Sequence, residues 1–558
     1  MKKILQIFIA VVFIFGAVQQ TMAQNGNTTE TAGVIDNIMN YDDYYIFAVD
    51  KAGSMYRWDA SDVIKEALSR KAIEEPVDNV IMNKRVINTW NMFTLTKNGS
   101  IYEWITNNGV PIPKKIDIPE PVEKIYKYNN IKDEWQIPYY AITTSGALYV
   151  WGGNKNGELG VGNYEKVIEK PIKVNIKEPV KDIISVISEH GNRGWNTYHL
   201  STYCITKNGS LYVWGYNGEG QLKLGDEKNR ISPVKVDFPE PIKELKYISI
   251  NESESEIYAI TNSGSMYMGW YGNHTPTKVD IKGKIKDIKI LNTAVIDTKK
   301  SSSNEKKYKM IPFVYALADD GSLYTWALYE QYVNTNKNKP KKINISEPVK
   351  EIITVPSTFP SVYAITQNGS LYSWGNNDDG WCMTGINDKI IDTPKKVNID
   401  EKIKKLEFLY RNYDLTIYIL TSDGSLYAWG NNSDGQLGIG NFKDNNRNKL
   451  VKVNINEHIK EIIVAGSTYA ITKNGALYSW GKNDYGQLGI NSYEDTPTPT
   501  KVDITEPVKK IINSDSGSVY YAVTDNGSLY LWGKHPYAST LLGVEKKENI
   551  IKATKVVY

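Results

Sequence analysis

Residue types that can do chemistry occur throughout the sequence, but their spacing matches no catalytic or metal-binding arrangement. The five histidines are scattered, without the spacing of a zinc site. In Gly283-Lys284, Gly481-Lys482 and Gly533-Lys534 no Ser or Thr follows the lysine, so the magnesium ligand of a phosphate-binding loop is missing. No Gly-x-Ser-x-Gly turn presents a nucleophilic serine. We therefore expect no catalytic residue, no metal and no cofactor.

Two runs, Asn376–Gly380 and Asn431–Gly435, are rich in the side-chain oxygens that calcium prefers. Both lack the bidentate glutamate and the ligand spacing of a calcium loop. We interpret them as turns.

Composition excludes several classes of protein. The 558 residues include 66 Lys+Arg and 63 Asp+Glu, and a net charge of +3 is too small for a protein that binds the nucleic-acid backbone. A hydrophobic fraction of 41% with 23% charged residues excludes a disordered chain. The two cysteines, Cys204 and Cys382, lie in different repeats, so we expect two buried thiols and no bridge.

The first residues have the pattern of an export signal. Lys2 and Lys3 precede an apolar run, Ile4–Val18, and small residues end at Ala23. We predict a signal peptide at residues 1–23, a short polar leader at 24–33 and a secreted, extracellular protein. A membrane anchor is the alternative, although the run is short for a span of about 20 residues. No second apolar run of spanning length occurs, so we expect no membrane span in the mature chain.

One phrase recurs about every 50 residues over residues 34–558. Its fullest form, Tyr469–Gly481, has a central glycine, a tyrosine three residues later and, in nine of ten copies, a tryptophan five residues later. Asn or Asp precedes the glycine in seven copies, which predicts a β-hairpin with a type I′ turn. We expect the repeated glycines to meet backbone angles and the aromatic residues to pack between units. The residues given this structural role are Gly146, Tyr149, Trp151, Gly209, Tyr212, Trp214, Gly424, Tyr427, Trp429, Gly475, Tyr478 and Trp480.

Two further strands complete each repeat. An apolar run such as Pro348–Ile353 precedes the hairpin, and a Pro-x-Lys-Val-x-Ile run such as Pro276–Ile281 follows it. A Glu-Pro turn, as at Glu178-Pro179, then leads into the next unit. Four short strands per unit are typical of a propeller blade. We therefore expect an all-β propeller of about ten four-stranded blades.

The two ends of the repeated region complement each other. Val34–Ile38 matches the first strand of a unit, and Thr554–Tyr558 matches the fourth. We expect the ring to close by pairing the N- and C-terminal strands, which removes exposed sheet edges. Single propellers have about 4–8 blades, so an oversized ring, an open spiral and a ring with leftover units stay open as alternatives.

In six copies a Gly-rich loop follows the tryptophan, most fully at Gly430–Gly440. The pattern Trp-Gly-x-Asn-x-x-Gly-Gln-Leu-Gly resembles the repeat of the regulator-of-chromosome-condensation family, and the copies cover nearly the whole region after residue 33. The resemblance implies a propeller that displays loops for protein binding. The export signal and the lack of a basic patch favour the secreted bacterial branch, whose members bind protein surfaces, β-lactamase inhibition included, over the nuclear founders.

Strand alternation places the Gly-rich loops on the same face as two long insertions, Ser185–Leu200 and Leu291–Ile311. Loops of variable length often carry function, so we expect a protein partner on this face, either extracellular or on a cell surface. Coverage of the loop interiors is the alternative role. An extracellular polysaccharide hydrolase or lyase is the alternative function, with paired carboxylates near the axis. The candidate contact residues are His190, Arg193, Trp195, His199 and Trp381.

Overall fold

The computed structural model contains strands and no helix among the residues that it describes. The predicted signal peptide and leader lie outside those residues. The structure describes residues 35–40, 45–50, 53–59, 73, 75–81, 92–107, 110–127, 137–190, 197–249, 255–268, 276–296, 308–327, 339–355, 361–377, 380–411, 414–442, 450–513, 519–534 and 549–555.

The strands fall into ten consecutive units, numbered here along the chain. Units 1 to 3 contain β1 (Ile35–Asn40), β2 (Tyr45–Asp50), β3 (Met55–Asp59); β4 (Val77–Ile81), β5 (Met92–Thr96), β6 (Ile101–Asn107), β7 (Val110–Ile116); and β8 (Val122–Lys127), β9 (Pro138–Thr143), β10 (Leu148–Gly153), β11 (Val167–Lys173). Units 4 to 6 contain β12 (Val180–His190), β13 (Thr197–Thr206), β14 (Leu211–Gly215), β15 (Arg230–Val236); β16 (Ile242–Ser249), β17 (Ser255–Thr261), β18 (Met266–Met268), β19 (Thr277–Lys278); and β20 (Ile285–Ile296), β21 (Tyr308–Ala318), β22 (Leu323–Ala327), β23 (Lys341–Lys342). Units 7 and 8 contain β24 (Val349–Thr354), β25 (Ser361–Thr366), β26 (Leu371–Asn376), β27 (Ile390–Lys396); and β28 (Ile403–Arg411), β29 (Asp414–Thr421), β30 (Leu426–Gly430), β31 (Val451–Lys452). Units 9 and 10 contain β32 (Ile459–Val464), β33 (Thr468–Thr472), β34 (Leu477–Gly481), β35 (Thr496–Lys501); and β36 (Val508–Asn513), β37 (Val519–Thr524), β38 (Leu529–Gly533), β39 (Ile550–Lys555).

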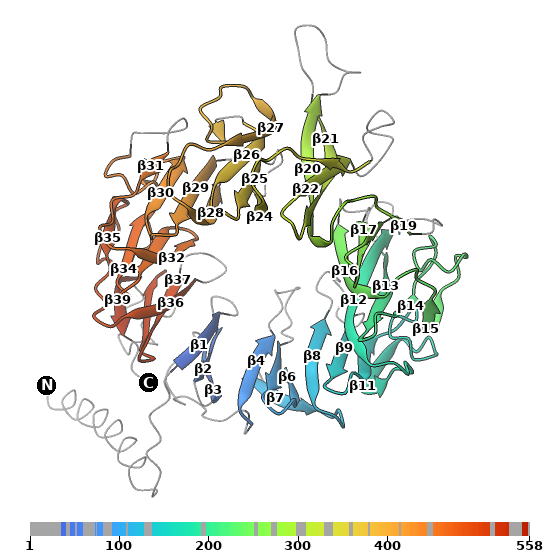
Figure 1. The fold of residues 1–558 in the computed structure, drawn as a ribbon. Coiled ribbons are helices and arrows are strands. Elements are labelled where there is room, and N and C mark those ends of the chain that lie inside the picture. Colours follow the sequence, from blue (N-terminus) through green and yellow to red (C-terminus); the bar gives the residue numbers. More distant parts are fainter. Residues whose placement is uncertain are drawn as a thin grey trace, which may run out of the picture.

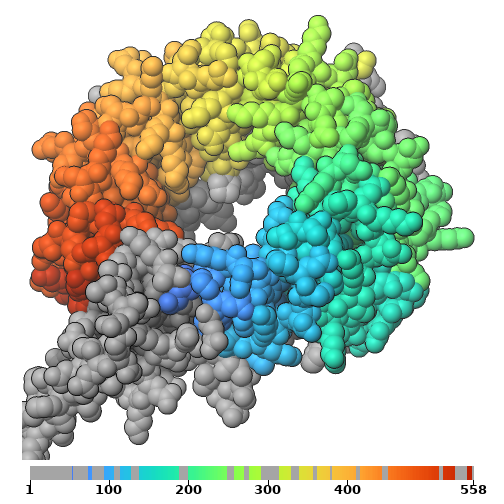
Figure 2. Space-filling model, turned by 60° about the horizontal axis from the view of Figure 1, so that its bottom comes forward, coloured from blue at the N-terminus to red at the C-terminus, as the bar shows by residue number. Residues whose placement is uncertain are grey.

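Each of units 2 to 10 is an antiparallel sheet whose hydrogen-bonded neighbours follow chain order. The units stand side by side around a central opening (Figure 1). The first strand of a unit faces the opening and the fourth lies at the outer rim, and we call them the inner and outer strands. The predicted all-β propeller of four-stranded blades is confirmed. Figure 2 shows the same ring in space-filling form.

The hydrophobic core lies between neighbouring units. Tyr140 and Val150 of unit 3 share one buried cluster with Ile183, Cys204 and Trp214 of unit 4. The dense apolar pattern of the second and third strands follows from this arrangement, because each sheet is covered on both faces. Cys204 and Cys382 are both buried and unbridged, as the sequence predicts.

The repeated hairpin differs from the predicted type I′ turn. In unit 4, Gly209 has φ of 87° and donates its N–H to the Thr206 carbonyl (2.9 Å), whereas Asn208 has no positive φ. A left-handed residue in the last position of a three-residue loop defines a type I turn with a G1 bulge. Asn208 instead accepts hydrogen bonds through Oδ1 from Thr206 Oγ1 and from the Ser210 N–H (3.3 Å). The dipeptide therefore predicted the hairpin correctly and its turn type wrongly.

The first and last units meet by packing. β1 lies against β36 and β37 of unit 10. Within the described residues, β1 pairs only with β2, and β39 pairs only with β38, so the predicted hydrogen-bonded pairing of the terminal strands is not present there. The described part of unit 1 comprises three strands.

The described parts of the two long insertions are strands. Ser185–Leu200 extends the first hairpin of unit 4, with Ser185 opposite Thr202 and His190 opposite Thr197. Leu291–Ile311 extends that of unit 6 in the same way, with Ile296 opposite Tyr308, and this hairpin projects from the ring in Figure 1. The sequence pointed to variable loops, but β-branched residues in both arms favour pairing.

Candidate interaction surface

Alternation of strand direction gives the ring two faces. The Gly-rich loops, which join the third and fourth strands, and the long hairpin tips share one face, here called the loop face. The repeated glycine hairpins and the Glu turns share the other, here called the hairpin face. At Gly146 the carbonyl of one unit accepts the N–H of Val180, the first inner-strand residue of the next unit (2.8 Å).

A buried asparagine holds each complete Gly-rich loop in shape. In unit 9, Asn483 Oδ1 accepts the N–H of Leu488 (2.9 Å), and Nδ2 donates to the carbonyls of Ser492 (2.8 Å) and Glu494 (3.0 Å). Asn432 in unit 8 does the same with Leu437 and Asn441. These side-chain bonds take the place of the inter-strand backbone hydrogen bonds that a loop lacks. They hold the backbone of the loops on the loop face in one conformation.

The tryptophan of one unit binds the Gly-rich loop of the unit before it. Trp480 Nε1 donates to the carbonyl of Gln436 (2.8 Å), and Trp532 Nε1 donates to that of Gln487 (2.7 Å). Trp214 binds the Glu158 carbonyl in the same way (2.7 Å). Glycine is required beside the indole, because a Cβ on Gly438 would lie 2.9 Å from Trp480 Nε1.

Two units lack the loop glycine of this contact between a Gly-rich loop and the next unit's tryptophan. Lys223 and Met383 occupy the equivalent glycine position, with φ of 59° and 54°. After Lys223, the next unit carries Gly269 in its sequence where the others carry tryptophan. After Met383, the next unit keeps Trp429, and its buried Nε1 has no hydrogen-bond partner. The glycine and the bonded tryptophan therefore depend on each other.

Exposed aromatic side chains gather on the complete Gly-rich loops. Tyr164 in unit 3, Phe442 in unit 8 and Tyr485 and Tyr493 in unit 9 are between 38% and 56% exposed. Units 8 and 9 are neighbours, and the loop of unit 8 is tied to the outer strand of unit 9 through Gly440 N–H and the Pro497 carbonyl (2.8 Å). Three exposed aromatic rings thus belong to the loops of two neighbouring units, and the first loop is bonded to the second unit. Large amphipathic side chains on a rigid backbone are typical of binding surfaces.

Of the predicted contact residues, His199 and Trp381 have described side chains, and they belong to different units. His199 stacks on Tyr216 with ring centroids 4.3 Å apart. Trp381 is 9% exposed and packs in the core between units 7 and 8, so its ring is a packing residue and not a surface contact. Arg193, Trp195 and the side chain of His190 lie outside the described residues, and their contact role stays a prediction.

The contacts predicted from the sequence lie mostly in a long insertion, so they do not include these four exposed aromatic residues. The available signal was an aromatic residue that recurs four positions after the loop glycine in the three complete loops, as Tyr164, Phe442 and Tyr493. Tyr485 stands at another position of the unit 9 loop.

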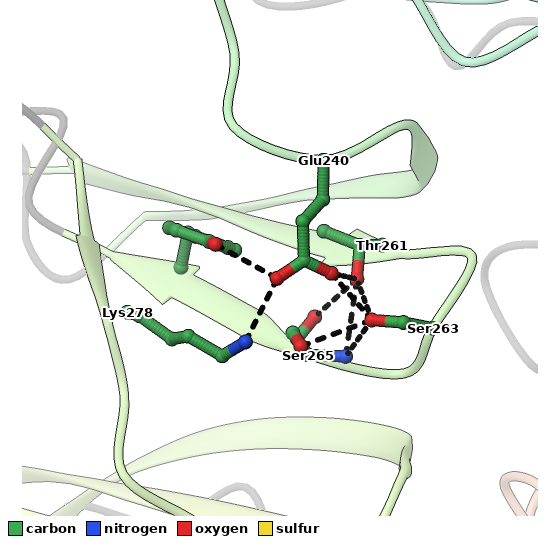
Figure 3. Close-up of polar contacts among 6 residues, drawn as sticks. Glu240, Thr261, Ser263, Ser265 and Lys278 are labelled. Carbon is green, nitrogen blue, oxygen red and sulfur yellow. Dashed lines mark hydrogen bonds and ion pairs between the residues drawn. The ribbon is translucent and has the colours of Figure 1, made fainter.

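On the hairpin face, the glutamate of the turn before each inner strand organises the hairpin of the same unit. In Figure 3, Glu240 accepts hydrogen bonds from Thr261 Oγ1 (3.0 Å), Ser263 Oγ and Lys278 Nζ (2.8 Å). Tyr267 also donates to it through its hydroxyl (2.9 Å). We call this a glutamate cluster, and it explains the repeated tyrosine. The glutamates placed in this way are Glu75, Glu120, Glu178, Glu240, Glu347, Glu401, Glu457 and Glu506.

These contacts stabilise the ionised carboxylates. The Lys235 ammonium and the Ser210 hydroxyl lower the pKa of Glu178 from 4.5 to about 2. In Glu506 hydrogen bonds from Lys555 and Ser528 outweigh burial and also lower the pKa to about 2. Unit 6 departs from the pattern: Ala318 and Gly283 replace the threonine and the glutamate, and Tyr324 donates to the Lys282 carbonyl (3.0 Å). The sequence showed these glutamates only as parts of turns.

No group of three or more His, Cys, Asp or Glu side chains is placed to hold a metal ion in the described part of the chain. In the same residues, no helix is long and apolar enough to cross a membrane.

The fold and the hydrogen bonds between tryptophans and Gly-rich loops define a propeller built from one repeat. Comparison with known sequences shows which repeat family this unit resembles. The family described as Regulator of chromosome condensation (RCC1) repeat matches residues 145–187, 208–247, 423–471 and 474–520. These four segments of the chain are similar to the RCC1 repeat.

The relatives are distant. The ultraviolet-B receptor UVR8 of Arabidopsis thaliana is 24% identical over 365 residues, covering 63% of this chain and 64% of the receptor. The E3 ubiquitin-protein ligase HERC2 of Mus musculus is 25% identical over 428 residues, covering 74% of this chain and 7% of the ligase. The chain therefore spans less than two thirds of the length of these relatives. The crystal structure of Kap60 bound to yeast RCC1 (Prp20) matches with 17% identity, 74% coverage of this chain, 83% of that chain and a TM-score of 0.33.

Proposed function

We propose that the protein is a secreted, non-catalytic RCC1-repeat propeller that binds a protein partner through its loop face. The proposal rests on Phe442, Tyr485 and Tyr493, which are exposed on two neighbouring loops whose backbones are fixed from within. Aromatic side chains lose little conformational entropy on binding, so they are efficient contacts when the backbone beneath them is already ordered.

Relatives support a role in recognition. Their names describe a receptor, a GTPase regulator and a ubiquitin ligase, and HERC2 is far longer than this chain. The chain matches 13% of the X-linked retinitis pigmentosa GTPase regulator of Homo sapiens with 34% identity over 136 residues. Residues 4–18 supply the argument for export, and an exported propeller meets extracellular or cell-surface proteins.

The loop face is tested by substitution and capture. We expect the triple variant Phe442→Ser/Tyr485→Ser/Tyr493→Ser to lose a partner that the native protein captures by crosslinking from the exported proteins of its own organism. The double variant Ile105→Ser/Ile172→Ser is the control, because both isoleucines are exposed on sheet strands and not on the Gly-rich loops.

Three outcomes would oppose the proposal. Equal retention of the partner by the loop variant would move the site off this face. Cleavage of an extracellular polysaccharide by the purified protein would support the enzymatic alternative. Retention of the intact N-terminus in the cytoplasm, measured by fractionation and N-terminal sequencing, would remove the export step.

A further inference from the structure

The inner strands carry a repeated irregularity next to the central opening. In all ten units the pairing of the inner strand with the second strand skips one residue, the second of the strand, and forms a β-bulge. A bulge re-aims the side chain of the extra residue and interrupts pairing. The inner strand follows the Glu turn, so this residue lies at the hairpin-face end of the opening.

The charge at the bulge is sorted around the ring. In units 4 to 10 every bulge residue is a lysine, and we call this run the lysine arc. In units 1 to 3 every bulge residue is acidic. The lysine arc consists of Lys181, Lys243, Lys286, Lys350, Lys404, Lys460 and Lys509, and the acidic positions are Asp36, Asp78 and Glu123.

Protection of a free sheet edge does not explain this sorting. Charged residues and bulges on an edge strand prevent pairing with another chain, and either sign of charge serves that purpose. Edge protection therefore accounts for a charged bulge in each unit, but it leaves the run of seven lysines beside three acids unexplained.

Five lysines of the lysine arc form no ion pair with a carboxylate among the described residues. Lys243, Lys286, Lys350, Lys404 and Lys460 are exposed, and none of the ion pairs between described residues involves them. Lys181 and Lys404 donate to neutral groups, the backbone carbonyls of Lys243 (2.6 Å) and Lys460 (2.9 Å) in the next unit.

Several acidic groups near the lysine arc have partners other than its lysines. Asp182 accepts a hydrogen bond from Tyr126 (2.7 Å), and Asp287 binds Lys246 (2.7 Å), so these inner-strand carboxylates join neighbouring units. The turn glutamates are held in their own clusters by outer-strand lysines, as Glu240 is by Lys278 (Figure 3). This end of the opening thus carries one lysine in each of seven consecutive units.

We propose that the lysine arc binds an acidic segment of a protein, inserted into the central opening from the hairpin face. Like charges around a concave rim focus their field on its axis, where a compact loop with clustered carboxylates meets several lysines at once. An extended polysaccharide lying across the opening reaches fewer of them. The arc contains no arginine, whose planar fork suits sulfate and phosphate, and lysine acts as a point charge. This surface lies opposite the loop face and is independent of it.

The test uses a fluorescein-labelled peptide of about ten consecutive glutamates, with binding to the full-length protein followed by anisotropy. We expect binding at low salt that weakens toward ~0.15 M ionic strength. The variant Lys243→Gln/Lys350→Gln/Lys460→Gln should bind roughly tenfold or more weakly. It removes charge without adding any, and these ammonium groups make no hydrogen bond within the described chain, so folding should be preserved.

The matched control is Lys170→Gln/Lys341→Gln/Lys395→Gln, which removes three exposed lysines from outer strands. It should bind as the native protein does. The variant Glu123→Lys should bind more tightly, because it extends the lysine arc by one unit.

Equal weakening in the control would reduce the effect to net charge and overturn the proposal. Absence of peptide binding by the native protein would also overturn it. Heparin binding that exceeds peptide binding and depends on the same three lysines would assign the arc to a polysaccharide instead.

Discussion

Trp480 donates its indole N–H to the carbonyl of Gln436, which lies in the preceding unit (2.8 Å). The hydroxyl of Tyr418 donates to the same carbonyl (2.6 Å). One loop oxygen therefore joins the second strand of its own unit to the third strand of the next. The shape of the loop face consequently depends on packing between units.

The bonded tryptophan should matter more than its unbonded counterpart. Trp480→Phe removes a buried hydrogen bond and part of a buried ring, and we expect a loss of about 2–3 kcal/mol. Trp429→Phe removes similar volume but no hydrogen bond, so its loss should be smaller by about 1 kcal/mol. Urea denaturation followed by circular dichroism measures both. Equal losses would show that the hydrogen bond contributes nothing.

The glycine beside the indole can be tested against a glycine of similar φ in open space. Gly438 (φ 68°) would place a Cβ 2.9 Å from Trp480 Nε1, whereas a Cβ on Gly225 (φ 79°) meets nothing within 4 Å. Gly438→Ala should therefore destabilise the protein by about 1–3 kcal/mol more than Gly225→Ala. Thermal unfolding of both variants checks the difference, and an equal effect would mean that only the backbone angle matters.

The glutamate clusters should make stability fall in acid. The pKa of Glu178 is lowered from 4.5 to about 2, so its stabilising effect is present above pH 4.5 and is lost as the pH falls toward 2. Glu178→Gln should lower the unfolding midpoint at pH 7 and flatten the acid slope. The exposed Glu165→Gln is the control and should change neither. An unchanged slope in Glu178→Gln would contradict the assignment.

Glu158 should behave in the opposite way. This carboxylate stands where Gln436 and Gln487 stand in other loops, and burial raises its pKa. Because the folded-state pKa is above the unfolded one, stability is lost as the pH rises through the raised value. Glu158→Gln should therefore gain stability near pH 8 and match the native protein near pH 4. A variant that is less stable at every pH would show that the bonds from Asn156 outweigh burial.

The repeated glycines and tryptophans were sufficient to predict the unit and its four strands, because each unit presents the same pattern to the same neighbours. Contacts between distant residues were not readable in this way. The pattern does not predict that Trp214 donates to a carbonyl 56 positions earlier. Nor does it predict that Glu240 accepts a hydrogen bond from the hairpin that follows it. Trp381 was misplaced because an aromatic residue at the Gln436 position turns inward, which only the neighbouring unit determines.

The joint between Gly438 and Trp480 bears on how such a chain can lengthen. A gene duplication with its boundary at the Glu turn separates a Gly-rich loop from the tryptophan of the next unit that binds it. A copied unit then needs a matching tryptophan after it and a matching loop before it. The pair of units with Lys223 and Gly269 lacks both the loop glycine and the tryptophan, whereas Trp429 is kept although Met383 replaces the glycine before it. The contact between a Gly-rich loop and the tryptophan of the next sheet is therefore best inherited as one piece. Recombination is best tolerated inside a sheet, where it does not divide this contact.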